Sequence, residues 1–287
     1  MPELPEVERL TTWVGDRVAG LRVTRCELAS FSALKTVDPP LSTLVGRQAV
    51  GGQRRGKHVC LDFDGQWLVV HLARGGWLRW YDSLPALVAR PGRKGPMALR
   101  MGFDDGSGFD LTEAGTEKRL ALWVVHAPDD VPSIASLGVD PLSPSFTADR
   151  LGELLGGLGA TLKTALATQS LIAGVGNAYS DEALHAAKLS PYKKASTLDA
   201  DEVERLHRAV VGVLTEALQR TAGLPASALK GDKHRAMQVH GRTGLPCPIC
   251  GDTVRQVSFA SRSMQYCPTC QTGGRVLADR RLSRLLK

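Results

Sequence analysis

The sequence predicts an α+β protein in which a β-rich domain precedes a helical domain and a small metal-binding module. Three observations lead to this prediction. Short apolar runs separated by Gly, Asp and Pro fill residues 21–126, apolar residues recur at helical spacing after about residue 145, and two Cys-x2-Cys pairs lie near the C-terminus. The 287 residues are enough for roughly two domains, each with its own core.

The chain begins with a predicted helix over residues 5–19. Pro5 suits the first helical turn, and the neighbouring glutamates suit the positive end of the helix dipole. Apolar residues repeat at helical spacing along one face, at Val7, Leu10, Val14 and Val18. This face is therefore expected to be buried.

The β-rich character of the first half comes from five short apolar runs bounded by turn residues. They are LRVTRCEL, HVCLDF, QWLVVHL, ALRMGF and LALWVV. Such runs, broken at short intervals by turn residues, are typical of a β-sandwich or a β-barrel. The residues alone leave these two alternatives open.

A Pro-, Asp- and Ser-rich stretch after residue 126 is expected to be a linker, and the pattern then becomes helical. Helices are predicted over three stretches: from a cap at Ser145 or Thr147 to Leu155, from about Asn177, and from Asp199 or Asp201 to about Arg220. Beyond Gly223 the chain is basic and is expected to be loop-like as far as the cysteines.

Charge and hydropathy restrict the class of partner. The chain has 36 basic and 29 acidic residues, a net charge of +7. Residues 231–287 contain ten basic and three acidic residues, so this end of the chain accounts for the whole net charge. A basic end on a neutral body indicates a polyanion, with nucleic acid as the first candidate. The N-terminus lacks the apolar stretch of a signal peptide and no run is apolar enough to span a membrane, so a cytoplasmic protein is expected.

Four cysteines form the most specific short motif. The spacing Cys247-x2-Cys250-x16-Cys267-x2-Cys270 is typical of a tetrathiolate zinc site, with unrelated thiols or an iron–sulfur site as the alternatives. Four cysteines leave no open coordination position, so one structural Zn²⁺ is predicted, with no catalytic role. The intervening VSFASRSMQY indicates a hairpin with Arg262 near its tip.

Four separated stretches point to one family. They are MPELPEVE at the start, RRGKHVCLDFD, GVGNAYSDEALHAAKLSP, and the cysteine segment that follows QVHGRTGLPCPICG and ends YCPTCQ. Over residues 1–271 the chain resembles the formamidopyrimidine-DNA glycosylase and endonuclease VIII family of base-excision repair, and MPELPE favours the formamidopyrimidine branch.

The resemblance implies a fold in three parts: an N-terminal β-sandwich, a helix-two-turn-helix domain and a four-cysteine zinc finger. The expected boundaries are 1–130 for the catalytic β-sandwich, 131–145 for a linker, 146–230 for the helix-two-turn-helix domain, 231–272 for the zinc finger and 273–287 for a basic tail.

The N-terminal proline is the expected nucleophile. Removal of Met1 exposes the Pro2 amine, and an α-amine titrates near ~8 where a lysine titrates near ~10.4, so about a tenth of it is free base at neutral pH. Such an amine can attack a sugar C1′ and form a Schiff base. The resemblance assigns this role to Pro2 and acid/base work to Glu3. The alternative is that both residues merely begin the first helix.

Two further residues match catalytic positions of the family. Lys57 matches its β-turn lysine, which implies a phosphate contact and proton donation, and Arg262 matches its zinc-finger arginine, which implies binding of the phosphate beside the lesion. The alternative in each case is a solvated surface cation.

Six residues are expected to contact DNA by the same resemblance. Asn177 would hold a phosphate at a helix start, with a simple helix cap as its alternative. Residues 71–76 read HLARGG where the family has HLGMSG, and residues 118–121 read KRLA where the family has RRFG. These differences alter the side chains that fill the gap left by a flipped base. The expected set is His71, Arg74, Arg119, Leu120, Lys163 and Asn177.

Together these features predict a monomeric, nucleoid-associated glycosylase and abasic-site lyase. It would act on damaged double-stranded DNA, excise formamidopyrimidines or other oxidised purines, and need no small-molecule cofactor. The alternatives are a specialist for oxidised pyrimidines or abasic sites, and a non-catalytic damaged-DNA-binding protein. Because residues around Arg74 and Leu120 differ from the family, the sequence does not fix the preferred lesion, the opposite base or whether 8-oxoguanine is a substrate. The role of residues 221–240 also stays open.

Overall fold

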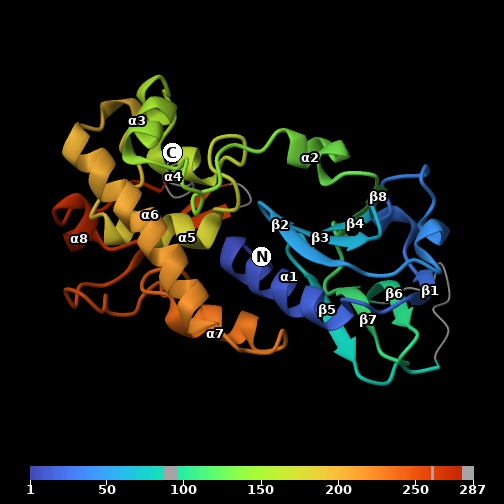
Figure 1. The fold of residues 1–287 in the computed structure, drawn as a ribbon. Helices are drawn as coiled ribbons and strands as arrows, with labels where there is room; N and C mark the ends of the chain where they lie inside the picture. Colours follow the sequence, from blue (N-terminus) through green and yellow to red (C-terminus); the bar gives the residue numbers. More distant parts are fainter. Residues whose placement is uncertain (87–95, 260–261, 280–287) are drawn as a thin grey trace. The chain divides into compact units, whose positions relative to one another are not determined.

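The computed structural model describes residues 1–86, 96–259 and 262–279 (Figure 1). The chain divides into two compact units. Unit 1 comprises Met1–Ser136 with Thr221–Lys230, and unit 2 comprises Leu137–Arg220 with Gly231–Lys287.

Unit 1 opens with α1 (Leu4–Val18), which confirms the predicted first helix. Its apolar stripe is fully buried in the core of the unit, from Val7 to Val18. The helix lies against strands β2 (Gly51–Arg55) and β3 (His58–Phe63) (Figure 1). A Cβ on Gly15 would lie 2.9 Å from the Gly52 backbone nitrogen, so only glycine permits this close approach of helix to strand.

The β-rich half is a sandwich, which resolves the alternative that the residues left open. Its two antiparallel sheets have the orders β1-β6-β7-β5 and β2-β3-β4-β8. The strands are β1 (Val23–Leu28), β2 (Gly51–Arg55), β3 (His58–Phe63), β4 (Gln66–His71), β5 (Gly76–Tyr81), β6 (Met97–Phe103), β7 (Gly108–Glu113) and β8 (Ala121–Val125). All five predicted runs form strands, whereas β2, β5 and β7 were not predicted.

A later stretch of the chain also belongs to unit 1. Ala226 and Leu229 are buried in the core of the sandwich unit, and Leu224 packs against it. The expected boundary at residue 230 placed this stretch with the helical domain, but burial of these apolar side chains groups Thr221–Lys230 with unit 1. The expected loop after Gly223 is also wrong in part, because α7 (Leu229–Ala236) begins within it.

Unit 2 contains the predicted helices. Thr147 is the N-cap of α3 (Ala148–Gly156), α5 spans Asn177–Ala186, and the Asp199 side chain accepts a hydrogen bond from the Glu202 backbone at the start of α6 (Ala200–Arg220). Three other short helices were not predicted. They are α4 (Leu162–Ala167) and α8 (Pro268–Thr272) in unit 2, and α2 (Pro132–Ala135), which falls within the expected linker.

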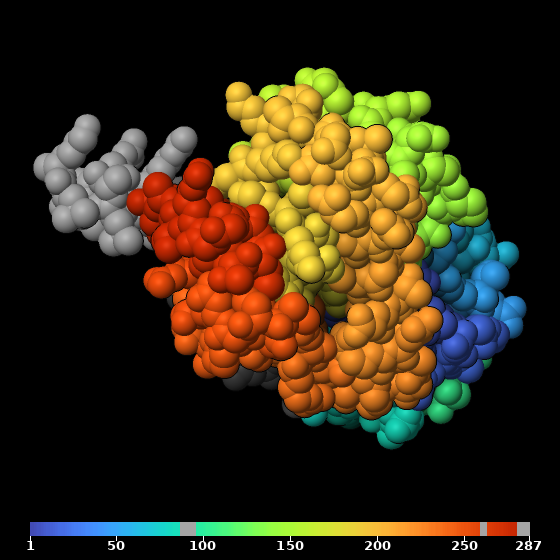
Figure 2. Space-filling model, turned by 90° about the vertical axis from the view of Figure 1, so that its left-hand side faces the viewer, coloured from blue at the N-terminus to red at the C-terminus, as the bar shows by residue number. Residues whose placement is uncertain are grey.

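The C-terminal part of unit 2 carries the predicted hairpin. β9 (Arg255–Phe259) pairs with β10 (Arg262–Tyr266), and α8 (Pro268–Thr272) follows. Figure 2 shows this segment, in orange and red, beside the yellow and orange helices of the same unit. Of the expected tail, residues 280–287 lie outside the described residues. Among the helices that the structure describes, none is both long and apolar enough to cross a membrane.

Candidate functional site

The N-terminus is anchored by the first turn of α1. Glu3 is the N-cap residue, and its backbone N–H donates to the Glu6 carboxylate at 2.8 Å. Pro2 and Glu3 are both buried, while Met1 is half exposed. The predicted nucleophile and its neighbouring carboxyl group are therefore held in fixed positions at the start of a helix.

Lys57 lies in a two-residue turn between β2 and β3. Gly56 precedes it with φ 56°, the left-handed value that a glycine at this turn position accommodates without a Cβ clash. The Lys57 side chain is 7% exposed, so it is not the solvated surface cation of the alternative interpretation.

Arg54 links this turn to the first helix, and sequence reasoning missed it. Its Nε donates to the Glu8 carboxylate at 2.6 Å, and its guanidinium also donates to the Gly56 carbonyl at 3.2 Å. One buried guanidinium therefore fixes the backbone beside Lys57 against α1, whose first turn carries Glu3. The signal in the sequence was weak, because arginine in a polar stretch is common on surfaces.

Two histidines pack beside Lys57. His58 and His71 are partners across β3 and β4, with ring centroids 4.9 Å apart. His58 Nδ1 lies 3.1 Å from the Arg55 carbonyl oxygen, and its Nε2 lies 3.0 Å from the Ser133 hydroxyl. Burial is the main cause that lowers the pKa of each ring to about 4, and the Lys57 charge contributes to both shifts. Both rings are therefore neutral at pH 7.

Acid should destabilise unit 1 through these histidines. Their pKa values lie below the ordinary 6.5, so the unfolded chain takes up protons first, and stability falls as pH drops from about 6.5 to about 4. Each histidine should contribute up to about 1.4 kcal/mol per pH unit within that window. Urea unfolding at several pH values should show this slope, and His58→Phe should reduce it by one proton. The exposed His126→Phe should not, and equal slopes in all three proteins would contradict the assignment.

The two predicted gap-filling loops lie side by side at one end of the sandwich. The Ala114 N–H donates to the Gly75 carbonyl at 3.1 Å, and a Cβ on Gly75 would lie 2.3 Å from the Ala114 carbonyl oxygen. Arg74 is exposed on the first loop and Arg119 on the second. This close backbone approach brings the two predicted arginines onto neighbouring loops.

Glu113 orders the second loop and was not predicted. Its side chain is buried, and its two oxygens accept the backbone N–H groups of Arg119 and Leu120 at 2.8–3.0 Å. Leu120 is 2% exposed and belongs to the core of unit 1. If Leu120 fills the gap left by a flipped base, as predicted, its side chain must therefore leave that core.

Asn177 lies at the first residue of α5, and Gly176 is the N-cap, so the interpretation of Asn177 as a helix cap is wrong. Its side-chain amide donates to the Ser263 carbonyl oxygen at 2.8 Å. Lys163 is 8% exposed, and its Nζ contacts the Asn177 carbonyl oxygen, the Ser180 hydroxyl and the Asp181 carboxylate at 2.6–2.8 Å. Three protein acceptors thus surround the predicted DNA-binding ammonium.

Replacing Lys163 with Met should chiefly lower stability. Among the described residues, the His240 ring and the Gln265 N–H then remain as partners of the fully buried Asp181 carboxylate, and breaking a buried ion pair costs about 3 kcal/mol. Denaturant unfolding should show this loss, while Lys194→Met, at an exposed position, should change stability by less than about 0.5 kcal/mol. Unchanged stability with weakened DNA binding would instead favour a direct phosphate contact.

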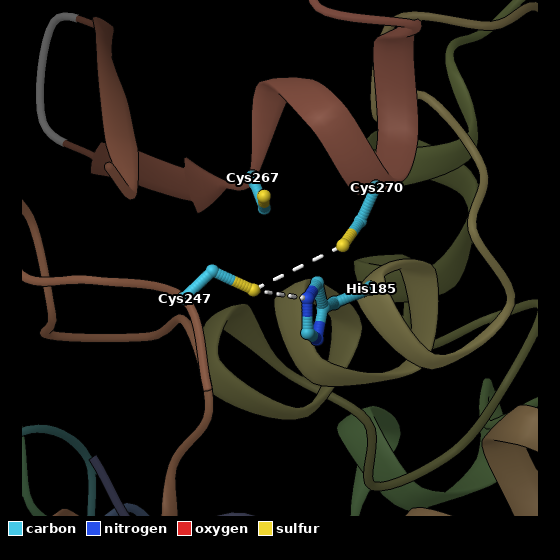
Figure 3. A group of neighbouring side chains, drawn as sticks. All are labelled: His185, Cys247, Cys267 and Cys270. Carbon is cyan, nitrogen blue, oxygen red and sulfur yellow. Dashed lines mark hydrogen bonds between the residues drawn. The ribbon is translucent and has the colours of Figure 1, made fainter. Parts of the chain in front are cut away.

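The four cysteines converge as their spacing predicts. Cys247 Sγ lies 3.9 Å from Cys270 Sγ, and Cys250 Sγ lies 3.3 Å from Cys267 Sγ. Zn–S bonds of about 2.3 Å place tetrahedral sulfurs about 3.8 Å apart, so this donor set fits one structural Zn²⁺. Figure 3 also shows the His185 ring of α5 beside Cys247, a neighbour that the sequence pattern did not indicate.

Arg262 begins β10, and its backbone pairs with Phe259, the last residue of β9. The side chain of Arg262 lies outside the described residues, as do residues 260–261. Its predicted contact with a phosphate therefore stays a prediction.

A β-sandwich, a helical domain and a tetrathiolate finger in this order define a recognised class of repair protein. Family models match residues 1–116 as the formamidopyrimidine-DNA glycosylase N-terminal domain, 137–226 as its H2TH (helix-two-turn-helix) domain, and 244–273 as the zinc finger found in FPG and IleRS. The chain belongs to the formamidopyrimidine-DNA glycosylase family, and its scaffold is one that binds damaged DNA.

The chain is similar to one relative over about half of its length and to others over nearly all of it. An uncharacterized formamidopyrimidine-DNA glycosylase-like protein of Mycobacterium tuberculosis is 54% identical over 54% of this chain and 98% of its own. The formamidopyrimidine-DNA glycosylase of Symbiobacterium thermophilum is 36% identical, and the match covers 94% of this chain and 89% of that protein. Among solved structures, a point mutant of Lactococcus lactis FPG in complex with DNA containing Fapy-dG is 27% identical. It superposes with a TM-score of 0.82, and the match covers 94% of this chain and 100% of that chain.

Proposed function

We propose that this protein is a bifunctional DNA glycosylase and abasic-site lyase that excises formamidopyrimidines or other oxidised purines from duplex DNA. The observation that carries the proposal is the N-terminus of unit 1, where Pro2 and Glu3 are held at the start of α1 and Arg54 connects that helix to the turn of Lys57. A protein that only bound DNA would not need an α-amine beside a buried carboxyl group.

The reaction begins at the Pro2 nitrogen. Its lone pair forms a bond to C1′ of the damaged nucleotide as the C1′–base bond breaks, and the departing base takes up a proton. Glu3 protonates the ring oxygen so that the deoxyribose opens to an iminium ion. Loss of a C2′ proton then expels the 3′-phosphate, and water releases the cleaved strand from Pro2.

The remaining residues would hold the substrate. Lys57 and Arg262 would bind the phosphates beside the lesion, and His71 and Asn177 would add neutral hydrogen-bond donors. Arg74 and Arg119 would fill the gap left by the extruded base, whose removal from the stack costs a few kcal/mol. We place this reaction in the cytoplasm, at the nucleoid, and assign it to a monomer.

Borohydride trapping on an abasic-site duplex tests the lyase. A covalent adduct that peptide mapping assigns to residue 2 is the expected result, and the intact mass should show that Met1 is absent. No adduct from protein lacking Met1 would favour the alternative, a non-catalytic binder of damaged DNA.

A substrate panel tests the lesion. Duplexes carrying a formamidopyrimidine, 8-oxoguanine opposite cytosine, an oxidised pyrimidine or an abasic site should be cleaved fastest at the formamidopyrimidine. Cleavage confined to the oxidised pyrimidine or to the abasic site would overturn the proposed preference and leave the lyase assignment standing.

A further inference from the structure

The zinc centre has a neighbour outside the finger. His185 lies near the C-terminal end of α5, and its ring is 5% exposed. Its Nε2 lies 3.3 Å from Cys247 Sγ, and the dashed line in Figure 3 joins them. The His185 nitrogen also lies within 4.8 Å of the sulfurs of Cys267 and Cys270.

The atoms that lie within 4.8 Å of one another are thus the His185 nitrogen and the sulfurs of Cys247, Cys267 and Cys270, and Cys250 is the fourth sulfur that the motif supplies. Cys250 lies 3.3 Å from Cys267, which keeps it within the sulfur cluster and completes a tetrahedron without the ring. His185 then lies outside the tetrahedron, against Cys247. A zinc-bound thiolate carries negative charge and accepts hydrogen bonds, so the tautomer of His185 that carries its hydrogen on Nε2 would donate to the Cys247 sulfur.

His185 belongs to a row of contacts along one face of α5. Asn177, Asp181 and His185 are four residues apart, so their side chains lie above one another on the helix. Asn177 donates to the Ser263 carbonyl oxygen, and Asp181 accepts from the Gln265 backbone at 3.2 Å. Both partners lie on β10, the strand that leads into Cys267.

We propose that His185 is a positioning residue of the zinc centre, which donates its Nε2 hydrogen to the Cys247 thiolate and fastens the metal site to helix α5. The hydrogen bond delocalises charge from the sulfur and restrains Cys247, so zinc leaves more slowly. Because α5 also holds β10, the metal site and the hairpin that carries Arg262 share one rigid support.

The first test measures zinc release. The zinc-loaded protein is mixed with a chromogenic chelator, and His185→Phe, which keeps a ring but removes the donor, should release zinc about tenfold faster than the wild type. His185→Gln, whose amide can donate a hydrogen bond, should release zinc at a rate between those of the wild type and His185→Phe. The matched control is His207→Phe, because His207 in α6 bonds the Phe146 carbonyl oxygen instead of a cysteine. Equal release from His185→Phe and wild type would overturn the proposal.

The second test separates an outer position from direct ligation. In the cobalt-substituted protein the visible ligand-field spectrum should be the same in wild type and His185→Phe, because both keep four sulfurs. A change in that spectrum would make His185 a ligand and overturn the proposal.

A third measurement needs no variant. Wild-type protein loaded with NMR-active cadmium should show scalar coupling between the metal and the His185 ring N–H, carried through the sulfur of Cys247. Absence of that coupling would overturn the proposal even where His185→Phe does not fold.

Discussion

Keeping Met1 on the protein should reduce the borohydride-trapped adduct by at least about a thousandfold. Pro2→Leu achieves this, because a bulky second residue prevents removal of the initiator methionine. The α-amine then belongs to Met1, one residue before position 2, and the residue 2 nitrogen becomes an amide with no basic lone pair. The measurement is single-turnover trapping on an abasic-site duplex, with the N-terminal mass recorded for each protein.

The matched control is Pro2→Ala. Alanine is small enough for Met1 to be removed, so this variant keeps an α-amine at residue 2 and differs mainly in being primary. It should still form an adduct, at a reduced rate. Because Pro2 is buried, both variants need a thermal melt that matches the wild type. Undiminished trapping in a folded Pro2→Leu protein would assign the nucleophile elsewhere, with Lys57 as the next amine to replace.

The sequence predicted the elements whose own residues contain the signal. The α1 face has an uninterrupted apolar spacing, and the five predicted strands have apolar cores, so periodicity was sufficient. β2 was not predicted because its sequence, GGQRR, has no apolar residue. It forms a strand because β3 pairs with it and α1 packs onto its glycines. Tertiary contact decided that strand, and tertiary contact is absent from a local pattern.

The candidate site divides in the same way. The cysteines were predictable because four ligands at fixed spacing form one motif. Arg54, Glu113 and His185 were not, because each acts on a partner distant in sequence or in another element. Lys163 shows the converse, since its match to a family position gave no indication that Asp181 holds its ammonium.

Loss of zinc should unfold the finger while unit 1 stays folded. Two small apolar clusters lie in this segment among the residues that the structure describes: Val239 and Val254 with the cysteines around the metal, and Val257, Met264 and Tyr266 on the hairpin. Burial of so few side chains does not offset the entropy of ordering about thirty residues. Structural zinc contributes about 10–16 kcal/mol in small fingers. The metal therefore supplies most of the free energy that folds this segment.

Cys267→Ser is the variant that tests this dependence. Cys267 is fully buried, and its side chain makes no cap hydrogen bond at the start of α8, so the serine variant removes a zinc ligand and leaves a residue that suits the helix start. Zinc content should fall from one per chain to near zero, and amide hydrogen exchange over residues 244–273 should become as fast as in an unfolded chain. DNA affinity should fall with it, because Arg262 lies on the hairpin between the two cysteine pairs.

The control is Cys26→Ser, a cysteine in β1 whose pKa burial raises to about 12, so that it stays a neutral thiol apart from the metal. This protein should keep one zinc and full protection of the finger. Protection of residues 244–273 that survives in zinc-free Cys267→Ser would mean that contacts with α5, through Asn177 and Asp181, fold the hairpin without the metal. Unit 1 should melt at the same temperature in Cys267→Ser and in the wild type, since its core contains none of the four ligands.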